Sequence, residues 1–198
     1  KYASDVGTRA DILYSCLIEK PANAGKLDAR AIGEKYKVKL LCTPPESTYE
    51  GMAFSDKIHY MANEKTIQSI LKFMSVRVVD HKLNNLLAEK VMCRPNTGFL
   101  AIYDVLQHKP KKLSVYGFSF YLDGFMPGCK RGIVLEQNKT EKQFANQCFT
   151  SKRHVQKNMW LHAKDTLRNN EIVKLDEHLK YILDMEEFSK EEFRKYLS

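Results

Sequence analysis

The stretch RPNTGFLAIYDVLQHKPKKLSVYGFSF, residues 94–120, holds a helix start, an apolar helix and a strand in that order. Asn96 is a residue type that commonly caps a helix at its first turn. The apolar residues of 97–107 predict a helix, and those of 113–120 predict a buried strand. A helix followed at once by a buried strand is one unit of an α/β fold.

The same alternation continues on both sides of this unit. Further strands are predicted at residues 11–18, 38–42, 76–80 and 172–175. Further helices are predicted at residues 27–36, 64–74, 82–90, 154–168, 176–183 and 189–196, the last opened by a capping box of Ser189 and Glu192. We expect an α/β fold that is Rossmann-like, with a mainly parallel sheet and helices on both faces. The polar stretch after Pro127, as far as Gln147, predicts a long loop.

The length and composition fit one domain over residues 1–198, with residues 185–198 as a C-terminal helical extension. No apolar run approaches the ~18 residues that a membrane-spanning helix needs. The net charge of +8 favours anionic partners, although the basic residues are spread along the chain and only Lys109, Lys111 and Lys112 form a tight group. We find no zinc module, RNA-recognition signature or basic helix, so no specific nucleic-acid partner is expected.

The chain has five cysteines, none in a CxxC pair or at zinc-site spacing. An odd number leaves at least one without a partner in the chain. Cys16 and Cys42 lie in apolar stretches, which predicts buried, reduced thiols rather than a disulfide framework.

Two places in the central stretch could hold an anionic ligand. The first amides of a helix that starts at Thr97 and Gly98 have no partner within the helix, and the helix dipole adds to their pull on a phosphate. Gly117 and Phe118 come at the end of a predicted strand, where ligands bind in open α/β sheets. One hypothesis is that the two places converge on one site. The other is that residues 96–98 are only a capped helix start and that Gly117 only permits close packing.

The order of these residues resembles the small sialyl motif of the sialyltransferase family. That motif has Pro-Ser-Thr-Gly, an apolar helix and then Val-x-Val-Tyr-Gly-Phe, and Asn96 stands here in place of the usual Ser. The matching residues are Pro95, Thr97, Gly98, Val115, Tyr116, Gly117 and Phe118. Residues 2–9, YASDVGTR, are similar to the end of the large sialyl motif of the same family, about 90 residues upstream.

A third similarity concerns His154, about 37 residues after Gly117 and at the start of a predicted helix. The family has a His-x4-Glu element at this place in the chain. Here Met159 stands where the Glu is expected, and the family's short aromatic and His-rich motif has no match. By itself, a histidine at a helix start predicts an ordinary surface residue. Only the resemblance implies a catalytic role for His154.

The resemblance implies a GT-A-variant-like glycosyltransferase that moves sialic acid, or a related sugar acid, from a CMP-sugar donor to a hydroxyl of a glycan or another acceptor. Such enzymes invert the anomeric centre without a metal or a further cofactor. His154 would be the general base. The donor nucleotide would be bound by Asn96, Thr97, Gly98, Tyr116, Gly117 and Phe118. The chain contains no Asp-x-Asp element, the usual metal site of other sugar transferases.

The chain also departs from the family. The first half of the large motif, with its strand, is missing, so either that strand lies upstream of Lys1 or the fold is rearranged. The family's small motif usually has a cysteine at a place that falls near Pro110 here, so the family's common disulfide is absent. Its absence favours a cytosolic protein, whereas an upstream anchor would place the protein in the Golgi lumen.

Three other functions stay open at this point. Met159 and the unmatched motif favour a non-catalytic descendant of the fold that acts as a binding or structural protein. The positive charge permits a nucleic-acid-binding protein. Another Rossmann-like enzyme, such as a methyltransferase or dehydrogenase, is also possible, although no GxGxxG follows a predicted strand.

Overall fold

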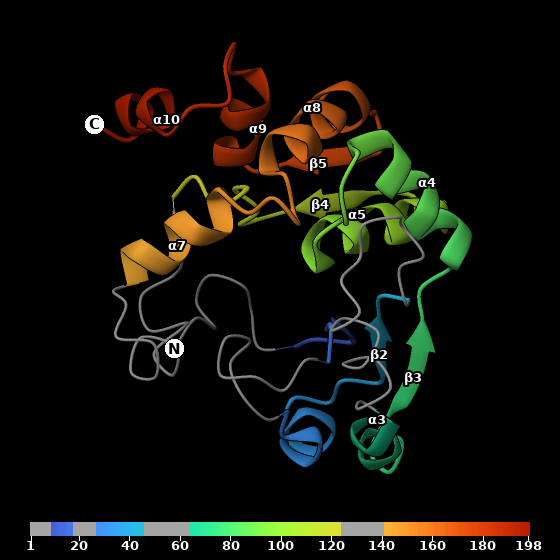
Figure 1. The fold of residues 1–198 in the computed structure, drawn as a ribbon. Helices are drawn as coiled ribbons and strands as arrows, with labels where there is room; N and C mark the ends of the chain where they lie inside the picture. Colours follow the sequence, from blue (N-terminus) through green and yellow to red (C-terminus); the bar gives the residue numbers. More distant parts are fainter. Residues whose placement is uncertain (1–8, 18–26, 46–63, 124–140) are drawn as a thin grey trace.

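The computed structural model describes residues 9–17, 27–45, 64–123 and 141–198 (Figure 1). The sequence match at residues 2–8, most of the predicted loop after Pro127 and the thiol of Cys129 lie outside these ranges. The described residues form a mixed α/β structure in which every paired strand is parallel. The predicted α/β class with parallel strands is therefore confirmed.

The five strands of the described residues form two sheets rather than one. The first has the order β1-β2-β3, made of β1 (Ile12–Tyr14), β2 (Leu40–Thr43) and β3 (Ser75–Val78). The second pairs β4 (Leu113–Val115) with β5 (Val173–Leu175).

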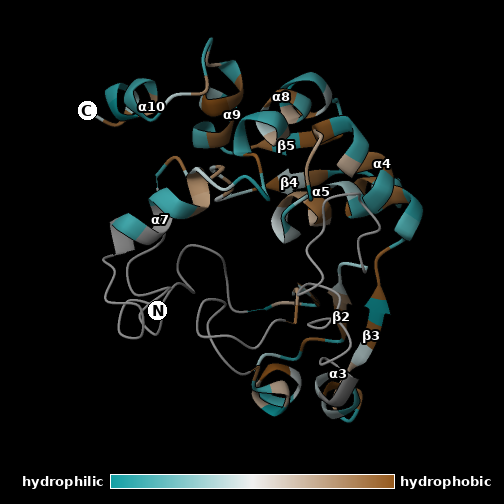
Figure 2. Ribbon diagram, in the orientation of Figure 1, coloured by the Kyte–Doolittle hydropathy of each residue, from teal (hydrophilic) through white to brown (hydrophobic). Residues whose placement is uncertain are grey.

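Most of the helices lie between strands along the chain, and α9 and α10 follow β5 (Figure 1). They are η2 (Ala31–Lys35, a π-helical turn), α3 (Glu64–Ile70), α4 (His81–Val91), α5 (Thr97–Gln107), α7 (Glu141–Phe149), α8 (Gln156–Leu167), α9 (Glu177–Asp184) and α10 (Lys190–Leu197). Helices α8, α9 and α10 each carry both apolar and hydrophilic residues (Figure 2), as helices that bury one face do.

Short polar side chains start four of these helices. Asp80, Asn96, Asp176 and Ser189 each accept a hydrogen bond from a backbone N–H of the first turn of α4, α5, α9 and α10. These caps pair donors that the helix itself cannot pair. The Asn96 cap explains why α5 begins at Thr97, and the predicted helix at 97–107 is confirmed at both ends.

Alternating side chains of the first sheet enter two different cores. Leu41 packs with residues of η2 and α3, in a small core that also holds Ile70 and Met74. The neighbouring Leu40 and Cys42 point to the opposite face and join a large core built from α4, α5, β4 and α8 to α10. Helices therefore cover both faces of this sheet, as the sequence predicts.

Several predicted boundaries are wrong. The strand predicted at 113–120 ends at Val115, because Gly117 has a φ of 68° and Phe120 one of 51°, which no extended strand accommodates. The helix predicted from His154 begins at Gln156. Residues 141–147, predicted as loop, belong to α7.

The cysteine predictions are confirmed in part. Cys42 is buried and has a free thiol, as predicted. Cys16 is also a free thiol but is only partly buried, because β1 ends two residues before it. Within the described ranges, no helix is long and apolar enough to cross a membrane.

Candidate functional site

The first turn of α5 presents unpaired backbone donors. Asn96 Oδ1 accepts from the Phe99 amide at 2.8 Å, and the Asn96 carbonyl accepts from the Leu100 amide at 2.9 Å. The amides of Thr97 and Gly98 come earlier in the turn and have no hydrogen-bond partner among the described residues. Gly98 is exposed. The helix start can therefore offer two N–H donors and the positive end of its dipole to an anion.

Phe118 lies directly against this helix start. A Cβ atom built on Gly98 would be 3.0 Å from Cε2 of the Phe118 ring, closer than ordinary packing allows. Twenty residues of chain separate the two, so the contact is made by the fold. The two places that the sequence singles out do meet, and the glycine is what permits the contact.

Gly117 shapes the turn after β4. Its φ of 68° is readily adopted only by glycine. Its amide donates to Asp176 Oδ2 at 2.7 Å, while Asp176 Oδ1 accepts from the Leu179 amide at 2.7 Å and caps α9. The Gly117 N–H is thus already paired. Tyr116 beside it is 64% exposed. We assign Gly117 a conformational role and find Tyr116 at the surface next to the site.

His154 is held just before α8, next to the start of α5. Its Nδ1 lies 2.8 Å from the carbonyl oxygen of Arg94. A carbonyl can only accept, so Nδ1 carries the proton and Nε2 keeps the lone pair in the neutral ring. Gln156 Nε2 donates to the His154 carbonyl at 2.8 Å, and Asn96 Nδ2 donates to Gln156 Oε1 at 3.4 Å. The buried Gln156 therefore links His154 to the cap of α5.

Met159 is fully buried in the large core. A carboxylate at this position would have to be placed among apolar side chains, at a high desolvation cost. The carboxylate neighbour that the family motif would provide is therefore absent for a packing reason. Burial also raises the pKa of the nearby Cys93 thiol, which accepts from the Val155 amide at 3.3 Å and makes a poor nucleophile.

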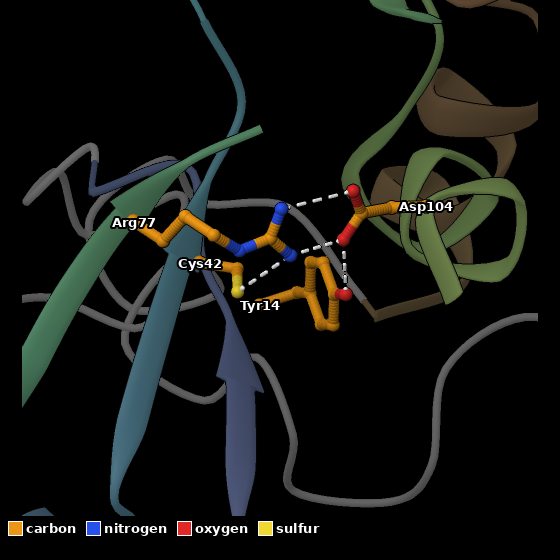
Figure 3. Close-up of polar contacts among 4 residues, drawn as sticks. All are labelled: Tyr14, Cys42, Arg77 and Asp104. Atoms are coloured by element: carbon orange, nitrogen blue, oxygen red, sulfur yellow. Dashed lines mark hydrogen bonds and ion pairs between the residues drawn. The ribbon is translucent and has the colours of Figure 1, made fainter. Parts of the chain in front are cut away.

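Sequence reasoning missed a polar cluster beneath α5 (Figure 3). Asp104, buried on α5, accepts from the Tyr14 hydroxyl at 2.5 Å and from Arg77 Nη1 at 3.1 Å, with a second bond from Arg77 Nη2. Arg77 Nη2 also donates to Cys42 Sγ at 3.2 Å. Tyr14, Cys42 and Arg77 are aligned across β1, β2 and β3. The one sequence signal was a lone acid in the otherwise apolar run 97–107.

The ionisation of the cluster is set by burial and pairing together. Burial alone would raise the pKa of Asp104, but the bonds from Arg77 and Tyr14 outweigh it and hold the pKa below its usual value. The Asp104 bond raises the pKa of Arg77, whose side chain is 32% exposed. Burial, then the bond to Asp104, raises the pKa of Tyr14. At neutral pH the cluster is a bidentate ion pair with a neutral phenol.

The cluster fixes α5 on the first sheet. Asp104 follows Gly98 by six residues, which is about 9 Å along a helix axis. The bidentate bond and the tyrosine restrict rotation of α5 about its axis. The position of α5 relative to the first sheet therefore depends on this cluster.

Within the described ranges, no three His, Cys, Asp or Glu side chains gather closely enough to hold a metal ion. Metal independence itself stays a prediction.

Comparisons with protein-family models, with curated proteins and with solved structures found no match to this chain.

Proposed function

We propose that this chain is a glycosyltransferase domain that transfers sialic acid or a related sugar acid from a CMP-sugar to an acceptor hydroxyl. One observation carries the proposal. Three segments far apart in the chain, at Gly98, Phe118 and His154, lie around the unpaired first turn of α5. Those are the segments that resemble the family's motifs. We further propose that the two small parallel sheets belong to a Rossmann-like, GT-A-variant-like domain.

The donor phosphate would bind at the start of α5. When the sugar leaves, negative charge develops on the phosphate of CMP, and donors that already point at it stabilise the transition state. The amides of Thr97 and Gly98 are suited to this, since the helix cannot pair them. Phe118 would pack against the nucleotide beside Gly98.

His154 would act as the general base. The acceptor oxygen bonds to the anomeric carbon while the bond to the CMP phosphate breaks, and the acceptor's proton moves to Nε2 of His154. The Arg94 carbonyl holds the tautomer that leaves Nε2 unprotonated. One displacement by this route inverts the anomeric centre and needs no metal or further cofactor.

The test is titration with CMP, with ADP and UDP as controls, followed by thermal unfolding. A ligand that binds only the folded state stabilises it by about 2.7 kcal/mol at 100 times its Kd. We expect a shift with CMP alone, lost in Gly98→Val, because the new side chain would displace Phe118 and cover the amides. His154→Ala should keep the CMP shift and lose sugar transfer.

Gly33→Ala is a matched control for general destabilisation. A Cβ on Gly33 would lie 2.9 Å from Cβ of Phe73, so this variant also crowds a phenylalanine, but one at the exposed turn before β3, away from α5. It should lower the melting temperature and keep the CMP shift. Loss of the shift in both variants would remove the support for a site at α5.

The alternative is a non-catalytic descendant that binds a ligand or a partner without turnover. The buried Met159 favours it, since no carboxylate can stand at that position beside His154. It predicts either no CMP shift or a CMP shift without transfer. The expected cytosolic location and the acceptor stay predictions.

A further inference from the structure

The end of the first sheet where β2 and β3 begin combines exposed lysines with exposed apolar side chains. Residues 34–37 close η2, and residues 71–73 lead from α3 into β3; all seven are exposed. Both turns lie at the same end of the molecule, the lower end in Figure 1. We name this surface the basic edge and define it as Lys35, Tyr36, Lys37, Leu71, Lys72 and Phe73.

The two turns of the basic edge are held together by backbone contacts. The Ser75 amide donates to the Lys39 carbonyl at 3.1 Å, where β2 and β3 begin. The Cβ position of Gly33 is 2.9 Å from Cβ of Phe73, so the η2 turn packs on the turn before β3. The basic edge is therefore one surface, fixed by the start of the parallel pair.

The apolar side chains on this surface are exposed to solvent. Tyr36 is 49% exposed, Leu71 48% and Phe73 38%. Three large apolar side chains on adjoining turns form a patch, and such patches mark contact surfaces more often than isolated exposed residues do.

The positive charge of the edge is not cancelled locally. Residues 27–39 and 71–75 carry five basic residues against two acidic ones, a net charge of +3. Glu34 pairs with Arg30 at 2.8 Å, and Asp11 pairs with Arg9 at 2.7 Å. Within the described part of the chain, Lys35, Lys37 and Lys72 form no ion pair.

We propose that the basic edge docks on an anionic membrane surface. Lysines attract anionic headgroups, while a tyrosine, a leucine and a phenylalanine beside them can enter the interface. Lysine stems also lie easily along an apolar surface with the ammonium group at the headgroups. Nucleic acid is the weaker reading, because Leu71 has no planar face for stacking on a base.

The test is co-sedimentation with vesicles of phosphatidylcholine and phosphatidylserine in equal parts, against vesicles of phosphatidylcholine alone. We expect binding to the anionic vesicles only. The triple variant Lys35→Glu, Lys37→Glu and Lys72→Glu should weaken it at least about tenfold.

A matched charge control uses the lysine group after α5. Lys109→Glu, Lys111→Glu and Lys112→Glu reverse the same charge at exposed positions away from the edge. This control should weaken binding no more than about threefold, through net charge alone. Equal losses in both triple variants would overturn the proposal.

A second pair of variants tests the apolar part. Tyr36→Ser with Leu71→Ser should lower vesicle binding about tenfold, whereas Leu86→Ser with Met92→Ser, at least as exposed on and after α4, should not. Binding of the wild type to duplex DNA but not to anionic vesicles would also overturn the proposal. Thermal unfolding of each variant confirms that it is folded.

Discussion

The two cores of this molecule differ in size and in kind. The large core contains twenty buried residues within the described ranges, among them Phe99, Trp160 and Phe193. The small core contains six, none of them aromatic. The residues proposed to bind the donor and to act as the base stand on the large core, whereas the basic edge stands on the small one. The difference indicates that the site has a rigid support and that the sheet beside it is held more weakly.

The first sheet is joined to the large core by polar as well as apolar contacts. Leu40 and Cys42 pack into that core, and the Asp104 cluster adds an ion pair and a phenol bond. A buried ion pair contributes modest net stability but is costly to break from one side. It also has one geometry, so it sets where α5 lies on the sheet.

The largest expected effect comes from a matched pair of core truncations. Ile182 and Ile70 are both fully buried, one in each core. We expect Ile182→Ala to lower the free energy of unfolding by about 4 kcal/mol and Ile70→Ala by about 2 kcal/mol, because a small core relaxes more easily around a cavity. Urea unfolding measures both. Equal losses would mean that the two cores are equally rigid.

The next largest effect tests the Asp104 cluster, which joins the first sheet to the large core. Asp104→Asn leaves Arg77 without its carboxylate and should cost about 3 kcal/mol at pH 7. Because the folded pKa of Asp104 lies below its usual value, the stabilisation is present above the unfolded pKa of about 3.9 and is lost as pH falls through the folded pKa.

The difference between wild type and Asp104→Asn should therefore shrink below about pH 4. Chemical unfolding at several pH values measures it. If the difference in the free energy of unfolding stayed constant as the pH fell below about 4, the carboxylate charge would not be what stabilises this contact.

The smallest effect concerns two helix caps. Asn96→Ala and Asp80→Ala each remove a side-chain acceptor at a helix start, and each should cost about 1 kcal/mol. Only Asn96→Ala should also weaken CMP binding, since Asn96 borders the unpaired amides and contacts Gln156. Thermal unfolding with and without CMP compares them. Equal CMP responses in the two variants would show that the donor site does not lie at the start of α5.

Local patterns located every strand and all but one helix of the described ranges, although several of the predicted boundaries were wrong. The run 97–107 was predicted to the residue because its cap and its apolar spacing agree. The strand after it was predicted five residues too long, since apolar residues continue past Val115 while positive φ angles break the extension. Helix α7 was missed because its polar composition resembles that of a loop.

The candidate site was predicted in its parts. Asn96, Gly98, Phe118 and His154 were singled out in the sequence, and the fold brings them together. Tyr116 proved to be exposed and Gly117 to be a turn residue with a paired amide. The partner of Gly117, Asp176, was predicted only as part of a helix.

The sequence by itself determined the α/β class, the parallel strands and the capped start of α5, because these follow from local spacing and side-chain chemistry. Only the tertiary structure decided that Phe118 meets Gly98, that Arg94 orients His154 and that Asp104 pairs with Arg77. These contacts join residues 20, 60 and 27 positions apart. No local pattern encodes them, since they depend on how the two cores pack around α5.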